Sequence, residues 1–252
     1  MAVAMECLAE KGFIVDSLGL FEGDNGDIKQ ADVLLLPVPT TRDGENVFCP
    51  LTNRILPLDW VYKAKPDALI LSCGYSFEDR SYIDYLKNDS FCLLNAVPTA
   101  EGAIARAIED TPFCIWGSKV LVIGNGRVGK VLWERLAALK CDLTVSARKN
   151  ADFALLEAMG IKYIHTNNVP DCAQKFDIIF NTIDVPIFKD RPECLNGLYL
   201  YDLSTKGCID FKRAQQLGIK AVKLPGIPGK VAPQTAGKII AQTVTRLTHE
   251  EI

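Results

Sequence analysis

Short apolar runs alternate with amphipathic stretches through the second half of the chain. Buried strands are predicted where apolar residues run together, at 119–123, 142–146, 177–181, 198–203 and 219–224. Helices are predicted where apolar residues recur at helical spacing, at 127–139, 151–159 and 211–217. Strands that alternate with helices are typical of a parallel sheet, so this half of the chain is expected to form a doubly wound α/β domain.

The first half of the chain shows the same alternation less regularly. It opens on a helical stretch, AVAMECLAE, and apolar runs then predict strands at 13–20, 31–38, 68–72 and 91–94. Residues 81–87 are expected to form one or two helical turns. Residues 1–94 are therefore predicted to form a second, smaller α/β domain of flavodoxin-like type that contributes to substrate binding.

An opening helix is unusual for such a domain, because a doubly wound sheet normally begins with a strand that becomes central. The first strand of the N-terminal domain is therefore expected to be missing. Either the chain starts downstream of the true start, with Met1 an internal methionine, or the domain has lost an element. The first explanation is favoured, since loss of a central strand would expose two unpaired sheet edges.

Two helices are expected to connect the domains. Thr99 can accept backbone N–H bonds at the start of an Ala-rich and Ile-rich stretch, which predicts a linking helix over 95–110, and Pro98 is expected to end the preceding strand. Residues 233–252 place four apolar side chains on one face of a terminal helix, and that face must be buried. We expect this helix to pack back on the N-terminal domain, which leaves 95–232 as the dinucleotide-binding domain with a cleft between the two.

Composition argues against several classes of function. The net charge is -3 and no long block of Lys and Arg occurs, so nucleic acid is not an expected partner. No signal peptide and no apolar run of about 18 residues is found, so a cytoplasmic protein without membrane contact is expected. The nine cysteines include no C-x-x-C pair and lie away from both histidines, so we expect buried, reduced thiols and no metal site.

A glycine-rich motif, VLVIGNGRVG, begins inside the predicted strand at 119–123. Gly124 permits a tight turn, Gly126 lets a pyrophosphate approach the backbone, and Gly129 lets the next helix pack closely on the strand. The start of that helix presents N–H groups to the phosphates. The turn is therefore predicted to bind a dinucleotide in the manner of a Rossmann domain, through Gly124, Asn125, Gly126, Arg127, Val128 and Gly129. The alternative is a turn of this shape kept only for packing.

The next strand indicates which dinucleotide is bound. Its end, VSARKN, lacks the Asp or Glu that holds the ribose 2′-hydroxyl of NAD. Ser146, Arg148 and Lys149 can instead hold a 2′-phosphate, and Arg suits bidentate contact with phosphate. The predicted cofactor is therefore NADP rather than NAD, unless the two cations only begin a solvated turn.

Polar residues also follow the later strands of this domain. Asn181 and Thr182 end one strand and are predicted to lie beside a nicotinamide ribose. Ser204 and Lys206 follow the next strand, and Lys230 lies in a loop with two Pro-Gly pairs over 225–233, which is expected to be rigid. Ser204, Lys206 and Lys230 are the catalytic candidates, and no general base is identified.

No Ser/His/Asp or Cys/His set is evident in the sequence. Neither His165 nor His249 is predicted to lie at a strand end, so a histidine-driven mechanism is disfavoured. For an anionic substrate the N-terminal domain offers Arg42, Arg54 and Arg80, each of which is otherwise a surface charge.

Four segments, NAVPTAEGAIARAI, GSKVLVIGNGRVGKVL, FNTI and FKRAQQLGIKAVKLPGIPGKVAPQTAGKIIAQTV, resemble the A subunit of dipicolinate synthase from spore-forming bacteria. The resemblance is strong over 95–244 and fainter over 1–94. Its most specific parts are 98–102 and 225–237, because the glycine turn is shared with many dehydrogenases.

The resemblance implies two Rossmann-like domains arranged as in the D-2-hydroxy-acid dehydrogenases. It also implies an oxidoreductase with a CH–CH donor, which oxidises a dihydrodipicolinate-type precursor from the lysine pathway to dipicolinate with NADP in the mother cell during sporulation. The implied partners are a small dicarboxylate substrate, a flavoprotein-like B subunit of the same synthase, and further copies of the chain.

The resemblance carries residue roles as well. It places Thr99, Glu101 and Gly102 in the hinge helix. The cleft loop then supplies further substrate-binding candidates, Pro225, Gly226, Pro228 and Gly229. Lys206 and Lys230 depart from the family pattern and add two cations that are compatible with a dicarboxylate. The alternatives are another NAD(P)-dependent small-acid dehydrogenase and a catalytically idle, NADP-binding regulatory protein.

Overall fold

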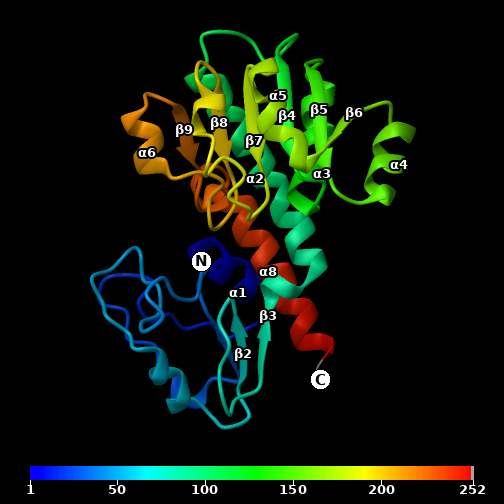
Figure 1. The fold of residues 1–252 in the computed structure, drawn as a ribbon. Helices are drawn as coiled ribbons and strands as arrows, with labels where there is room; N and C mark the ends of the chain where they lie inside the picture. Colours follow the sequence, from blue (N-terminus) through cyan, green and yellow to red (C-terminus); the bar gives the residue numbers. More distant parts are fainter. Residues whose placement is uncertain (251–252) are drawn as a thin grey trace. The chain divides into compact units, whose positions relative to one another are not determined.

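The computed structural model describes residues 1–250 and divides into two compact units (Figure 1). The first unit comprises Met1–Asn95 and the C-terminal segment that begins at Ala232, and the second comprises Ala96–Val231. Each unit is an α/β structure built on one parallel sheet, which confirms the predicted fold class.

The sheet of the second unit has six parallel strands. Their bounds are β4 (Lys119–Ile123), β5 (Asp142–Ala147), β6 (Lys162–His165), β7 (Ile178–Asn181), β8 (Tyr199–Asp202) and β9 (Lys220–Lys223). They lie in the order β6-β5-β4-β7-β8-β9, so the chain adds strands on one side of β4 and then returns to its other side (Figure 1). Ligands of such sheets bind outside the carboxyl ends of the strands where this order reverses, which here is between β4 and β7.

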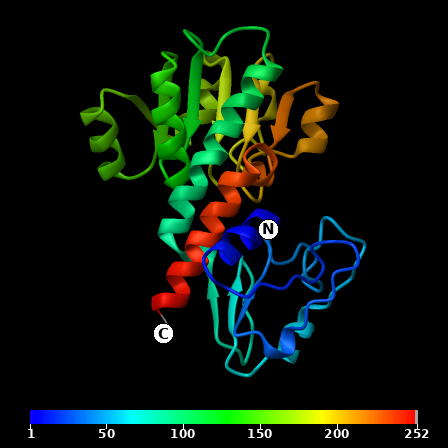
Figure 2. The same cartoon turned by 180° about the vertical axis from the view of Figure 1, so that it is seen from behind.

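Helices cover both faces of this sheet. One face carries α2 (Asp89–Asp110), α3 (Arg127–Ala138) and α4 (Asn150–Ala158), and Figure 2 shows α2 and α3 lying across it. The other face carries α5 (Val169–Cys172) and α6 (Phe211–Gln216). Successive residues of a strand point to opposite faces, so Val122 of β4 packs in the core beneath α3, and Ile123 packs in the core beneath α5.

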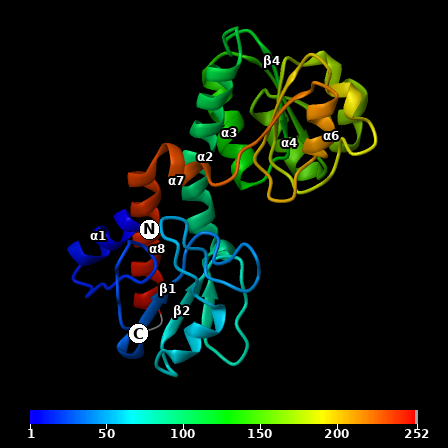
Figure 3. The same cartoon turned by 90° about the vertical axis from the view of Figure 1, so that its left-hand side faces the viewer.

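The sheet of the first unit has three parallel strands in the order β1-β2-β3. Their bounds are β1 (Val33–Leu35), β2 (Leu69–Ser72) and β3 (Tyr82–Asp84). The helices α1 (Ala2–Glu10) and α8 (Pro233–Glu250) pack side by side (Figure 3), and a Cβ added at Gly237 of α8 would lie 2.6 Å from Cβ of Val3. Both helices share one core with Leu71 of β2, so they cover the same face of the sheet.

The predicted terminal helix over 233–252 corresponds to α8. Its apolar face is buried as expected, with Ile240, Val244 and Leu247 in the core of the first unit. Residues 251–252 of the prediction lie outside the described residues.

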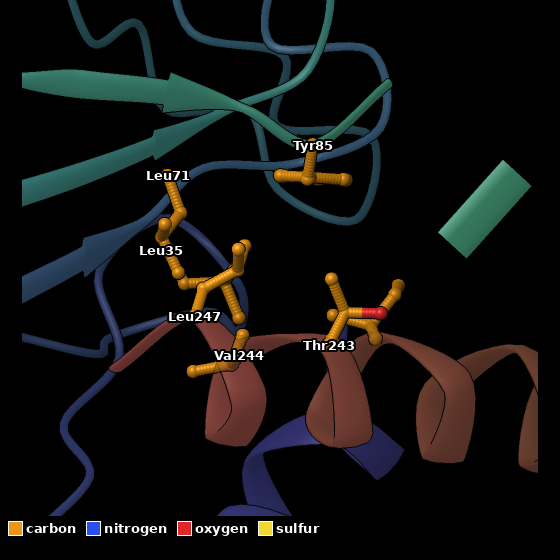
Figure 4. Close-up of a pocket in the computed structure, with 7 residues that line it drawn as sticks. Leu35, Leu71, Tyr85, Thr243, Val244 and Leu247 are labelled. Atoms are coloured by element: carbon orange, nitrogen blue, oxygen red, sulfur yellow. The ribbon is translucent and has the colours of Figure 1, made fainter. Parts of the chain in front are cut away.

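A narrow apolar gap lies between α8 and this sheet (Figure 4). It is lined by residues of both sides: Leu35, Leu71, Tyr85, Ile240, Thr243, Val244 and Leu247. Its two polar side chains are already bonded, because the Tyr85 hydroxyl donates to Leu36 O at 2.9 Å and Thr243 Oγ1 donates to Ile239 O at 2.8 Å. The gap therefore offers no polar group that would orient a ligand.

Short 3₁₀ helices of one or two turns connect these elements. They span Ile28–Gln30, Leu58–Lys63, Tyr85–Lys87, Thr166–Asn168, Ala173–Lys175 and Pro192–Leu195. The segment Leu58–Lys63 lies over the second face of the first sheet, where Val61 shares a core with Ile70 of β2.

The strand predicted at 13–20 is wrong, because this segment is irregular. The Asp24 carboxylate accepts the N–H groups of Gly19 and Leu20, at 2.7 and 2.9 Å, and so folds the end of the segment into a turn. Ile14 is fully exposed, and no strand pairs with the segment within residues 1–250. An apolar run without a neighbouring strand cannot satisfy its backbone groups as a strand would.

The strand predicted at 91–94 is also wrong, because these residues lie in the first turns of α2. The Asn88 side chain accepts the Phe91 N–H at 2.9 Å and caps the helix there. Contrary to expectation, Pro98 ends no element and Thr99 starts none, because both lie inside α2. A short apolar run is compatible with a buried helix as well as with a strand. Here the hydrogen bond from Phe91 N–H to the Asn88 side chain favours the helix.

The prediction of helical turns at 81–87 is correct for residues 85–87 only. Residues 82–84 form β3, and a 3₁₀ turn follows at 85–87. Neighbouring side chains of β3 enter different cores, since Tyr82 packs with the cluster around Phe77 and Ile83 with the cluster around Leu71. This alternation is the period of a strand.

The sequence pattern does not predict two elements of the second unit. The edge strand β6 has two exposed residues, Lys162 and Tyr163, and therefore lacks the apolar run of a buried strand. The loop predicted over 225–233 contains a short helix, α7 (Ile227–Val231), because proline is tolerated in the first turn of a helix, where Pro228 lies.

None of the nine cysteines forms a disulfide within the described residues. Cys73, Cys194 and Cys208 are buried, Cys114 is exposed and the other five are half-buried, so the prediction of buried thiols is correct for three of them only. Within residues 1–250, no helix has the length and apolar character needed to cross a membrane.

Candidate cofactor site

The glycine turn lies at the carboxyl end of β4, beside the point where the strand order reverses. Gly124 has φ of +103°, which L side chains rarely adopt, and a Cβ there would lie 2.5 Å from Ile183 Cγ2. A Cβ at Gly129, in the first turn of α3, would lie 2.1 Å from the carbonyl oxygen of Gly124. Packing alone therefore requires glycine at both positions.

Gly126 differs from these two glycines. Its backbone is extended, with φ of -81° and ψ of -165°, and nothing lies within 4 Å of a Cβ built on it. It is the exposed N-cap residue of α3, and it has no side chain to accept a hydrogen bond from the first turn. Open space beside the positive end of a helix dipole is what a pyrophosphate requires, so the residues present fit a dinucleotide.

Asn125 holds this turn in place. Its side chain is 8% exposed, its Oδ1 accepts from Trp133 Nε1 at 2.9 Å, and its Nδ2 donates to Asp152 Oδ1 at 3.0 Å. The side chain thus joins the turn to α3 and α4 at once. Its contribution to a cofactor site is to position the backbone of the turn.

Asn125→Ala is expected to lower both stability and cofactor affinity. The change leaves the Trp133 indole N–H buried without an acceptor, which costs about 1–3 kcal/mol. Thermal unfolding and a titration with NADP measure the two effects, and Asn150→Ala, at an exposed position in α4, is the control. Equal melting temperatures for the two variants would contradict this role for Asn125.

The residues predicted to hold a 2′-phosphate have different environments. Ser146 is fully buried, its Oγ lies 3.2 Å from Thr166 Oγ1, and its carbonyl accepts the Gly124 N–H at 3.1 Å. Arg148 and Lys149 are exposed and directly follow β5, the neighbour of β4. Ser146 therefore supports the turn from within the protein, and the two cations are the groups with access to a ligand.

The prediction that His165 does not lie at a strand end is wrong. It is the last residue of β6, paired in register with Ala147 of β5. Its Nδ1 accepts the Asn167 N–H at 3.2 Å, so one ring nitrogen is used within the protein. The sequence pattern does not place it there, because β6 lacks a buried apolar run.

Asn181 and Thr182 lie at the end of β7, across the reversal point from the glycine turn. Asn181 is fully buried, and its Nδ2 donates to Ile183 O at 2.9 Å and to Asp202 Oδ1 at 3.0 Å. Thr182 Oγ1 donates to Ile123 O at 2.8 Å. Both side chains fix the turn after β7 against neighbouring strand ends, and their contact with a nicotinamide ribose stays a prediction.

Asp202, the last residue of β8, is a residue of this edge that sequence reasoning missed. It is fully buried, and Ser204 donates to its Oδ1 from both the backbone N–H, at 2.8 Å, and Oγ, at 2.6 Å. Burial alone would raise the pKa of Asp202, but hydrogen bonds from Ser204 and Asn181 outweigh it and hold the pKa below its usual value. The carboxyl group is therefore charged at neutral pH. The signal in the sequence is its place at the end of a strand, in the segment YDLSTKG.

The catalytic candidates also differ in their exposure. The Ser204 hydroxyl is buried and bonded to Asp202, and it also accepts the Gly207 N–H at 3.1 Å, so it stabilises its own loop. Lys206 and Lys230 are exposed. These two lysines therefore keep their charge available for an anionic substrate.

The residues assigned through the resemblance lie around α2 and α7. A Cβ at Gly102 would lie 2.2 Å from Ile227 Cγ2, so α7 packs directly on α2. This contact fixes the segment that carries Pro225, Gly226, Pro228 and Gly229. Glu101 is exposed and accepts from Arg135 Nε at 3.3 Å, and Thr99 is half-buried in α2.

The three arginines of the first unit are not equivalent. Arg54 donates to Asp24 Oδ1 at 3.2 Å, and Arg80 donates to the carbonyl oxygen of Lys65. Arg42 is exposed and lies 3.8 Å over the ring of Phe48. Arg54 and Arg80 therefore stabilise loops, which leaves Arg42 as the arginine best placed to meet a ligand.

Comparison with known proteins identifies the family. No family model matches the chain. The A subunit of dipicolinate synthase from Bacillus subtilis (strain 168) is 33% identical to it over 246 residues, which cover 90% of this chain and 81% of that protein. The chain belongs to the family of dipicolinate synthase A subunits.

Solved structures of the same family agree. The dipicolinate synthase A chain from Bacillus subtilis matches with a TM-score of 0.83 and 30% identity, over 98% of this chain and 92% of that one. The A subunit of dipicolinate synthase from Bacillus halodurans matches with a TM-score of 0.79 and 31% identity, over 88% of this chain and 81% of that one. The resemblance seen in the sequence is thereby confirmed.

Dehydrogenases share the fold. A formate dehydrogenase of Granulicella matches with a TM-score of 0.50 and 16% identity, over 86% of this chain and 70% of that one. At this identity the likeness concerns the fold alone. The match therefore supports a dehydrogenase-type fold and carries no statement about the reaction.

Proposed function

We propose that this chain is the dehydrogenase component of a dipicolinate synthase, which oxidises a dihydrodipicolinate-type precursor from the lysine pathway to dipicolinate with NADP. The observation that carries the proposal is the open position at Gly126, at the start of α3 and beside the reversal point of the sheet. A chain that kept the turn only for packing would need glycine at 124 and 129 but not at 126.

The oxidation removes one hydride and one proton from the ring of the precursor. A bound NADP would supply the hydride acceptor, its nicotinamide ring, and the second hydrogen would leave as a proton. The product is an aromatic pyridine dicarboxylate, and the gain of aromaticity favours the transfer.

The chain's own residues bind and orient the reactants. The backbone at Gly126 and the first turn of α3 would hold the pyrophosphate, and Arg148 and Lys149 would hold the 2′-phosphate. Lys206 and Lys230 supply positive charge for the carboxylates of the substrate.

The proposal includes partners and a location. The Bacillus relatives of this chain are A subunits of a synthase, which supports a second, flavoprotein-like B subunit, and an assembly that contains further copies of this chain. A role in dipicolinate formation implies a location in the cytoplasm of the mother cell during sporulation.

The test combines the purified protein, a candidate B subunit, the lysine-pathway precursor and NADP. We expect reduction of NADP together with the ultraviolet absorbance of a pyridine dicarboxylate, and neither signal when Gly126→Leu replaces the unaltered protein. Binding of NADP without turnover in any combination would contradict the proposal and favour a regulatory protein. Turnover of a 2-hydroxy acid instead of the precursor would favour another small-acid dehydrogenase.

A further inference from the structure

Three polar residues stand side by side at the carboxyl ends of β7, β8 and β9. Asn181 of β7 is in register with Asp202 of β8, which is in register with Lys223 of β9. An amide, a carboxylate and an ammonium group thus occupy neighbouring strand ends at the edge where the cofactor site lies. Asp202, in the middle, is fully buried and is therefore shielded from solvent.

On one side, Asp202 holds the loop after β8. Its Oδ1 accepts from the N–H and the Oγ of Ser204, at 2.8 and 2.6 Å, and its Oδ2 accepts from the Cys208 N–H at 2.8 Å. The carboxylate therefore closes the loop 203–208, which carries Lys206, from both ends. Hydrogen bonds to an ionised acceptor are stronger than neutral ones, so this loop has little freedom.

On the other side, Asp202 reaches the glycine turn through Asn181. The Asn181 Nδ2 donates to Asp202 Oδ1 at 3.0 Å and to Ile183 O at 2.9 Å, which fixes the turn 181–183. Ile183 in turn sits beside Gly124, where its Cγ2 would lie 2.5 Å from an added Cβ. Asp202 thereby joins the loop that carries Lys206 to the turn on the cofactor side from within the protein. At the exposed side of the same loop, Asp184 Oδ1 accepts the Lys206 N–H at 2.7 Å and adds a second link.

Lys223 supplies the compensating charge. Its Nζ is buried, lies 3.9 Å from Asp202 Oδ2, and has no hydrogen-bond partner in the part of the chain that the structure describes. It also lies 5.7 Å over the ring of Phe211. A buried carboxylate without a nearby cation is costly, and at this distance the ammonium offsets the charge while the Cys208 N–H keeps its bond to Oδ2.

We propose that Asp202 is a positioning residue of the dehydrogenase reaction, which holds the loop 203–208 and the turn 181–183 at a fixed spacing. The proposal rests on the proposed function, because the two segments matter to catalysis only if substrate and nicotinamide meet at this edge. A role in stability alone does not account for the arrangement, since a buried charged pair is often no more stabilising than apolar residues of the same volume.

The first test is Asp202→Asn, with Asp210→Asn as the matched control. Asp210 also accepts two backbone N–H groups, of Lys212 and Arg213, but those bonds start α6 and lie outside the loop 203–208. We expect Asp202→Asn to lower kcat by about 100-fold, because a displacement of about 1 Å costs that much, while the Kd of NADP stays close to that of the unaltered protein. Asp210→Asn is expected to leave both values unchanged.

Hydrogen exchange separates this inference from the proposed function, because it needs neither cofactor nor substrate. Asp202→Asn is expected to speed amide exchange in 203–208 and in 181–183, and Asp210→Asn in neither segment. Unchanged exchange in Asp202→Asn overturns the inference whatever the activity. Faster exchange with an unaltered kcat also overturns it, because the residue is then structural only. An inactive unaltered protein contradicts the proposed function instead.

Ser204→Ala covers the case in which Asp202→Asn does not fold. It removes the hydroxyl bonds to Asp202 and Gly207 and leaves no buried charge without a partner. We expect faster exchange in 203–208 alone and a smaller loss of kcat with an unchanged Kd for NADP. An unchanged kcat despite faster exchange in this loop would overturn the inference.

Discussion

Replacing Gly126 by leucine is expected to abolish NADP binding and to leave the fold intact. Nothing in the protein lies within 4 Å of a Cβ at this position, so the new side chain meets no protein atom near its root. The backbone there is extended, with φ of -81°, and leucine adopts this conformation without strain. The space that the side chain takes is the space in which the pyrophosphate is proposed to lie.

The expected size of the effect follows from the bonds that are lost. Each hydrogen bond to a charged group contributes about 1.5–3 kcal/mol, and the loss of two such bonds weakens binding by at least about 100-fold. The cost to the fold is the poorer N-cap of α3, about 1 kcal/mol. For a chain of this size that lowers the melting temperature by about 2–4 °C. Calorimetric titration with NADP and thermal unfolding measure the two quantities.

Gly129→Ala provides the contrast, because its added Cβ would lie 2.1 Å from the backbone oxygen of Gly124. Here the turn itself must move, which costs about 1–3 kcal/mol, so stability and NADP affinity are expected to fall together. An NADP affinity that survives Gly126→Leu would show that the pyrophosphate lies elsewhere. A large loss of stability in Gly126→Leu would contradict the open space that distinguishes this glycine from the other two.

The fold of the second unit can be predicted from the sequence because its elements are long and their signals are local. The glycines at 124, 126 and 129 stand between a buried strand and an amphipathic helix, and each position proves to have its own geometric reason. The predicted helix at 127–139 and the observed α3 differ by one residue at the end. These signals come from residues that are close together in the chain, so they can be recognised in the sequence.

The first unit is harder to predict because its elements are short and their partners are distant in the chain. The helix start at Asn88 and the turn closed by Asp24 each depend on a single side chain. Three strands of three or four residues carry too few positions to show a period. Contacts between segments that are distant in the chain therefore determine where the elements of this unit begin and end.

The sequence predicts the position of the candidate site residues but not the direction of their side chains. Ser146, Asn181 and Thr182 lie at the carboxyl edge as expected, yet their side chains bond to other parts of the protein. A strand end places a side chain near the edge, and its orientation depends on the register with the neighbouring strand. The sequence likewise places Asp202 at a strand end, but its proposed role depends on its register with Asn181, which the sequence does not reveal.

Arg148→Asp is expected to shift the cofactor preference from NADP toward NAD. Arg148 follows β5 and is exposed, and no acidic residue occurs between the end of this strand and Asp152 of α4. A guanidinium group binds a phosphate by charge-assisted bonds worth about 1.5–3 kcal/mol each. Their loss, together with repulsion from the new carboxylate, is expected to raise the Kd of NADP by about 100-fold. The same carboxylate can accept a bond from the 2′-hydroxyl of NAD, so the Kd of NAD is expected to stay level or fall.

Lys175→Asp is the matched control for this prediction. It makes the same change of net charge in the same unit, but it ends the 3₁₀ turn that precedes β7 and so lies toward the amino edge of the sheet. Titrations of both variants with NADP and NAD, at low and high salt, give the ratio of the two Kd values. We expect a changed ratio in Arg148→Asp only, and a smaller difference between the two cofactors at high salt, because salt screens the contact between exposed charges. An equal shift in both variants would mean that the overall charge of the protein, rather than a 2′-phosphate held by Arg148, sets the preference.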